Sequence, residues 1–178
     1  MDTVFLHREL PVNGVEVKKN LWPVIRANLR LTDKSHVAVG FPGNKAKTQK
    51  MHGDSGMTVG QVAIANEMGS GPGVKPIVPA RPFVAETVRL HGDGFQKLST
   101  DLLGMISGGK MSTRIALGRM GKNGVDKMQD TIVQSETWAT ENAKSTKAKK
   151  RSSTPLIDTK TMVNSITYDV RMKGTKAP

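Results

Sequence analysis

Cysteine is absent from the 178 residues of the chain, and aromatic residues make up only 4% of them. The lack of thiols excludes disulfide bonds, thiolate metal sites and cysteine nucleophiles. No apolar run approaches the roughly 18 residues that a transmembrane helix needs, and the first ten residues lack the basic start and apolar run of a signal peptide. We therefore expect no membrane-spanning segment and a core of aliphatic side chains and the 10 methionines.

Positive charge is in excess, because 27 Lys and Arg residues against 15 Asp and Glu residues give a formal net charge of +12. Such an excess indicates nucleic acid, an anionic membrane or an acidic protein surface as a partner, and is otherwise a solvated face. Segments rich in Gly, Ser and Thr carry much of it, and we predict flexible basic loops over 43–57 and 142–155 and a frayed tail over 171–178. The second loop contains no acid, and its basic residues are Lys144, Lys147, Lys149, Lys150 and Arg151.

The spacing of apolar residues predicts four helices and two strands. The helices cover 20–31, 57–69, 82–107 and 112–134, and the strands cover 35–41 and 165–170. In the longest helix the apolar positions keep their phase from Val84 and Val88 through to Met105, across two glycines, which predicts one continuous helix. We expect a single α+β domain in which a small, mostly antiparallel sheet packs with a long helix and shorter helices.

Helix ends and faces follow from individual residues. Thr58 is the predicted N-cap of the 57–69 helix, and Met68 lies on its predicted apolar side. Asp158 or Thr159 is the predicted cap of a further helical turn before the last strand. Gly121 and Gly124 weaken the prediction of the 112–134 helix, since glycine lowers helix propensity.

Groups that could carry chemistry do not form a convincing site. His52, Asp54 and Ser55 are close in sequence, but a hydrolytic triad needs groups that converge from a rigid scaffold, and these share one predicted loop. The glycine-rich segment 69–75 lacks the spacing of a phosphate-binding loop. The histidines and carboxylates show no metal-ligand spacing. We predict no catalytic residue, no metal and no cofactor.

Two prolines stiffen the segment ahead of the longest helix. Pro79 and Pro82 fix their own φ angles and restrict the residues before them, so that Arg81 and Phe83 project in defined directions. Pro82 also suits the first helical position. We predict that this rod and the loop 43–57 contact neighbouring subunits or partners. The residues assigned to that contact are Lys45, Lys47, Lys50, Pro79, Arg81, Pro82 and Phe83.

Four short blocks occur in order between about residue 37 and residue 170: VAVGFP, VAIANEMG, VPARPF and STPLIDTKTMVNSITYDV. In these blocks the chain resembles the head–tail joining and tail-completion family of tailed bacteriophages. Members have a strand ending in Val-Gly-hydrophobic-Pro, a helix with Asn-Glu-hydrophobic-Gly, a Pro-Ala-Arg-Pro-Phe segment before a long helix, and a late Pro-Leu-hydrophobic-Asp-Thr-Gly turn. Met68 stands where the family usually has phenylalanine, and Lys160 stands where it usually has a glycine that allows a positive φ.

The resemblance implies a structural virion protein and not an enzyme. It implies a homo-oligomeric ring, six-fold, at the neck between the connector and the tail tube proteins, assembled in the cytoplasm of the host bacterium, with DNA passing through it. The basic loop 142–155 would then face channel DNA or an acidic neighbour. The residues alone leave an alternative open, a basic nucleic-acid-binding protein whose lysines contact phosphates in a salt-sensitive manner.

Overall fold

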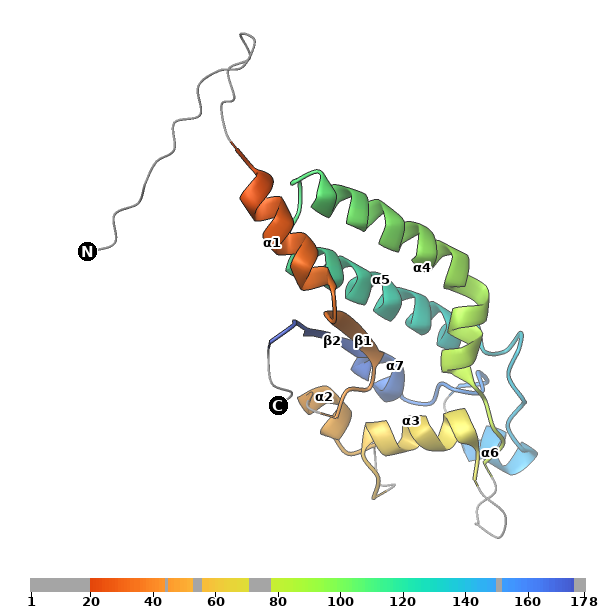
Figure 1. Ribbon diagram of the computed structural model, residues 1–178. Helices are drawn as coiled ribbons and strands as arrows, with labels where there is room; N and C mark the ends of the chain where they lie inside the picture. The colour runs from red at the N-terminus through yellow and green to blue at the C-terminus, as the bar shows by residue number, and fades with distance from the viewer. Residues whose placement is uncertain (1–19, 44, 53–55, 71–77, 150–151, 175–178) are drawn as a thin grey trace, which may run out of the picture.

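The computed structural model describes residues 20–43, 45–52, 56–70, 78–149 and 152–174. The order of elements is α1 (Trp22–Thr32), β1 (His36–Gly40), α2 (Ala46–Gln49), α3 (Val59–Met68), α4 (Phe83–Ser107), α5 (Thr113–Val133), α6 (Lys144–Lys149), α7 (Thr161–Ser165) and β2 (Thr167–Arg171). Figure 1 shows α4 and α5 as a long helical pair, with α3 and α6 at the opposite side of the domain. The predicted α+β class is confirmed.

Strand β1 pairs antiparallel with β2 in an unbroken register from His36 opposite Arg171 to Gly40 opposite Thr167, and α5 packs on this sheet. The helix approaches closely because it presents glycine at the contacts. A Cβ on Gly121 would collide with the ring of Tyr168, and one on Gly124 would lie 2.9 Å from a methyl carbon of Val39. The two glycines that weaken the helix in isolation are therefore what allow it to lie against the strands.

Helix α4 is one continuous helix of 25 residues, as predicted. It packs against α5, and its contact line is Phe83, Thr87, Leu102 and Ile106. Thr87 is buried without penalty because its hydroxyl donates to the carbonyl of Phe83 at 2.7 Å. The predicted apolar face is wrong in part, since Val84 and Val88 are 41% and 59% exposed.

Helix α3 begins at the predicted cap. The Thr58 hydroxyl accepts from the amide of Gln61, and the Gln61 side chain accepts from the amide of Thr58, which completes a capping box. The buried face is formed by Val59 and Ala63, so the predicted burial of Met68 is wrong. The cap predicted for the last helical turn is also wrong, because Lys160 holds that position with a φ of 60°.

The segments predicted as loops and tail contain regular structure. Residues 46–49 form α2, in which Thr48 is buried and its hydroxyl donates to the carbonyl of Pro42 at 2.6 Å. Residues 144–149 form α6. In the predicted frayed tail, Arg171 belongs to β2, and the backbone amide of Lys173 donates to the Ser35 hydroxyl at 2.9 Å. Hydrogen bonds within α2 and α6, and between the chain end and residues 35–36, thus hold segments that have few apolar residues.

Candidate functional site

The C-terminal end of α3, the segment before α4 and the chain after α5 meet around Arg81, whose side chain is 4% exposed. Its Nε donates to the carbonyl of Thr140 at 2.7 Å, and Nη2 donates to Oδ1 of Asn142 at 3.0 Å. On the other side, the Arg81 amide donates to the carbonyl of Asn66 at 2.7 Å. Burial lowers the pKa of the Arg81 guanidinium. The cation is held by neutral amide and carbonyl oxygens, which fixes three chain segments at one point.

This arrangement corrects the predicted interface. Arg81 and Phe83 do not project toward a neighbour, because Phe83 is 1% exposed and packs edge-on against Phe41 with ring centroids 6.1 Å apart. Pro82 is the N-cap of α4, and the Phe83 amide donates to the carbonyl of Arg81 at 2.7 Å, so a tight turn directs both side chains inward. Of the rod, Pro82 is exposed and Pro79 is half-buried.

Other residues of the resembling blocks complete the same junction. Glu67 accepts from the amide of Val84 at 3.0 Å and so caps α4, for which Pro82 supplies no side-chain cap. Gly69 ends α3 with a φ of 74°, and a Cβ there would lie 2.9 Å from the amide nitrogen of Ala80. Glycine at this position therefore allows the two segments to pass each other.

The late Pro-Leu turn joins the junction through Asn142. The side-chain amide of Asn142 donates to the carbonyl of Pro155 at 3.4 Å. The backbone amide of Leu156 donates to the Ser135 hydroxyl at 3.4 Å. Further along the turn, Lys160 adopts the left-handed conformation with φ 60° and ψ 4°. The conformation that glycine would supply is thus present although the residue is lysine.

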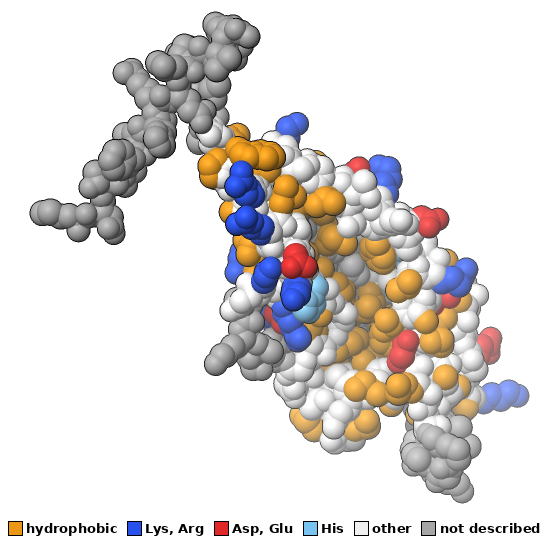
Figure 2. All heavy atoms as spheres, viewed as in Figure 1, with side chains coloured by type: hydrophobic (Ala, Val, Ile, Leu, Met, Phe, Trp, Pro, Cys, Tyr) orange, Lys and Arg blue, Asp and Glu red, His pale blue; other side chains and the backbone are white. Residues whose placement is uncertain are grey.

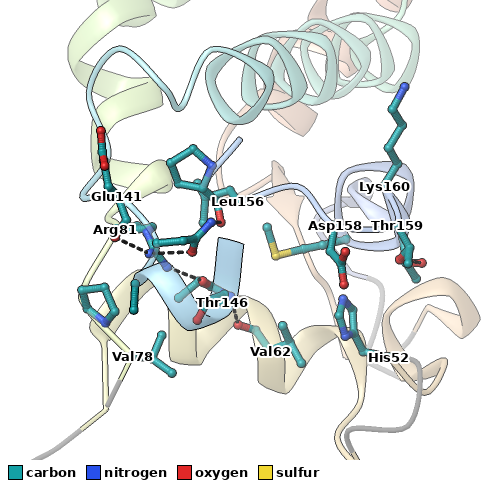
Figure 3. Close-up of a pocket in the computed structure, with 17 residues that line it drawn as sticks. His52, Val62, Val78, Arg81, Glu141, Thr146, Leu156, Asp158, Thr159 and Lys160 are labelled. Carbon is teal, nitrogen blue, oxygen red and sulfur yellow. Dashed lines mark hydrogen bonds between the residues drawn. The ribbon is translucent and has the colours of Figure 1, made fainter. Parts of the chain in front are cut away.

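A cleft of about 750 Å³ opens beside this junction, between α3, α6 and the turn 155–162. Its lining combines apolar side chains, such as Val62 and Met162, with polar ones. Figure 3 shows His52 and Asp158 pointing toward one another at one end of the cleft. This proximity was not predicted, because the two residues are far apart in sequence. Asp54 and Ser55 lie outside the described residues.

The basic residues assigned to partner contacts differ in whether they form ion pairs within the chain. Lys147 pairs with Glu141 at 2.7 Å, and this hydrogen bond lowers the pKa of the Glu141 carboxyl. The segment 142–155 contains no acid of its own, and Glu141, the residue directly before it, is the partner of Lys147. Lys45 pairs with Asp169 of β2 at 3.1 Å and ties the start of α2 to the sheet. Lys144 and Lys50 are exposed. The side chains of Lys47 and Lys149, and all of Lys150 and Arg151, lie outside the described residues.

A row of cations on α1 was missed by the sequence analysis. Arg26 and Arg30 lie four residues apart on one helix face, Lys34 follows the helix, and all three are exposed. None of them forms an ion pair within the described part of the chain. Arg26 also lies 5.8 Å from the ring centroid of Trp22, which is 58% exposed. Figure 2 shows the basic side chains as a column along α1. The four-residue spacing was the signal that could have revealed it.

The described ranges contain no group of three or more His, Asp or Glu side chains placed to hold a metal ion. None of the helices found there has both the length and the apolar character needed to cross a bilayer. In comparisons with known proteins, no family model, no curated protein and no solved structure matches the chain.

Proposed function

We propose that the chain is a structural subunit of a tailed-bacteriophage virion. In this proposal it forms a homo-oligomeric ring, six-fold, at the head–tail neck, where it completes the tail or joins it to the head connector. DNA passes through the ring. The role is mechanical, and no catalytic step or cofactor is assigned to it.

The observation that carries the proposal is the convergence of the resembling blocks. Asn66 of the second block binds Arg81 of the third, and Asn142 links Arg81 to Pro155 of the fourth. Short strings that matched a family by chance would have no reason to bind one another in space. Their joint burial supports the view that the likeness extends to a three-dimensional unit, and with it the family's function.

Exposed apolar side chains favour assembly. Ile64, Met68 and Val88 are 61%, 76% and 59% exposed, and they lie on α3 and α4. Ile64 shares a cavity wall with Val84, which lies four residues before Val88 on α4, and apolar patches exposed in this way mark contacts between proteins. A ring subunit needs two such surfaces, one for each neighbour.

A second candidate function is non-specific nucleic-acid binding, and the unpaired cations of α1 beside Trp22 favour it. A row of Arg side chains with an exposed aromatic ring can contact phosphates and stack on bases. The assembly state separates the two candidates. A binding module is a monomer or dimer with salt-sensitive DNA affinity, whereas a neck subunit enters rings or particles.

The direct test is a nonsense codon at an early position of this gene in the phage that encodes it. We expect filled heads and separate tails in electron micrographs of the lysate, and joined particles again in a suppressor host. Infectious, tailed particles that lack the protein would overturn the proposal.

A further inference from the structure

Strand β1 has an unpaired edge. One side of β1 bonds to β2, and no hydrogen bond joins the other side to any described residue. Free edges are normally protected by lysine, proline, a bulge or a covering element. The centre of β1, from Val37 to Val39, contains no charge or proline, and its register shows no bulge. This edge is therefore suited to receive another strand.

The surface beside that edge, here called the groove, consists of two separate cavities near the two ends of β1. A cavity of about 520 Å³ lies between β1, α3 and the first turn of α4, with Val39, Phe41, Ile64 and Val84 in its wall and no residue of β2. Near the other end of β1, a cavity of about 280 Å³ borders Ser35 and lies between the end of α1, α4 and α5, with no residue of β1 in its lining. Figure 2 shows hydrophobic side chains gathered in the hollow below α4. A strand added to β1 would cover this surface with its own apolar side chains.

We propose that residues 3–10 of this same polypeptide occupy the groove and extend the sheet as a third strand beside β1. The segment reads TVFLHREL, and Pro11 follows it. Its β-branched and aromatic residues are typical of strands, and proline ends a strand because it lacks an amide donor. The run from Val4 to Leu6 supplies apolar side chains to cover the apolar wall of the larger cavity.

The length of the chain permits this docking. The described chain begins at Asn20, at the start of α1. The nine residues from 11 to 19 span about 30 Å when extended, whereas the 11 residues of α1 cover about 16 Å. The segment can thus return along α1 to β1, or reach β1 of an adjacent copy.

Disulfide capture tests the proposal on the purified full chain. Because the sequence has no cysteine, Ala38→Cys can be combined in turn with Cys at positions 4, 5, 6, 7 and 8 without background. Neighbouring strands place opposite residues within disulfide range, and alternate residues face alternate sides. We expect efficient oxidation at positions of one parity and at least severalfold less at the other. The control replaces Ala38→Cys with Arg171→Cys on β2.

The products also report which copy donates the strand. A faster-migrating monomer indicates the same chain and a covalent dimer indicates a neighbour, and both support the proposal. No disulfide, or equal yields at all five positions and in the control, would overturn it.

Hydrogen exchange gives an independent measurement. Deletion of residues 1–12 should speed exchange in the peptide covering His36–Gly40 on the order of tenfold, and added peptide 1–12 should reverse the effect. The α5 peptide covering residues 113–133 serves as the internal reference, because its exchange should not change. Unchanged exchange of β1 after the deletion would count against docking even if the variant remains folded. Both readouts use the isolated protein, so they stand whether or not the chain is a virion component.

Discussion

Replacing Arg81 with alanine should destabilise the domain far more than an ordinary change before a helix. Two bonds of the guanidinium are short, 2.7 Å to Thr140 and 3.0 Å to Asn142, and two others at 3.4 and 3.5 Å are longer and weaker, so the sum below leaves them out. A hydrogen bond that involves a charged group contributes about 1.5–3 kcal/mol, so the loss of both is about 3–6 kcal/mol in the free energy of unfolding. That is a large share of a typical domain stability of about 5–15 kcal/mol.

Urea denaturation followed by circular dichroism would measure this loss, with the free energy of unfolding taken by linear extrapolation. Arg89→Ala is the matched control, because Arg89 lies on α4, the helix that follows Arg81, is exposed and pairs only with Glu86 in the described structure. We expect no measurable change for the control. A loss below about 1 kcal/mol for Arg81→Ala would refute the argument that Arg81 joins three segments. The double variant Arg81→Ala/Phe83→Ala is expected not to fold.

Three further outcomes are expected. Gly124→Ala should lower the free energy of unfolding by about 1–3 kcal/mol, because the added Cβ would meet Val39. Gly118→Ala should raise it by up to about 1 kcal/mol, because the space at its Cβ is open. Equal effects of the two variants in thermal denaturation would contradict the close approach of α5 to the sheet. Lys160→Gly should raise stability by about 1 kcal/mol, since a non-glycine residue holds a φ of 60° there, and a lower midpoint in urea would show that the lysine side chain stabilises the turn. If α1 contacts DNA, Arg26→Gln/Arg30→Gln should reduce the salt slope of binding by about 1.8, or about 0.9 per phosphate, while Arg89→Gln leaves it unchanged; a wild-type protein without DNA affinity would exclude the contact.

The limits of the helices were predictable because they depend on local chemistry. Thr58 and Ser112 accept hydrogen bonds from amides three residues later, and Pro82 precedes α4 directly. The buried faces were less predictable, because an apolar stripe does not reveal whether it meets a core or another molecule. Val88 lies on the apolar stripe predicted from the spacing, yet it is exposed. The buried side of α4 is the adjacent row of residues, which includes Thr87.

The site illustrates a different limit. The prolines predict a stiff segment at Arg81, but the direction of the Arg81 side chain depends on acceptors 59 and 61 residues further along the chain. No local pattern contains that information. Lys147 behaves similarly, since composition predicts an unpaired cation in a loop, whereas folding of α6 places it against Glu141.

The position of the resembling blocks suggests where partner contacts should be sought. Arg81, Phe83 and Leu156 come from those blocks and are buried, at 4%, 1% and 6% exposure. Residues that hold a scaffold together are constrained by each other, whereas surfaces that meet a partner are constrained by that partner. The first 35 residues, which carry little of the resemblance, include the unpaired cations of α1 and the segment proposed to dock on β1. If the chain assembles, its specificity should therefore reside in this N-terminal part and in the exposed apolar residues of α3 and α4, and substitutions there should change assembly without changing the stability of the subunit.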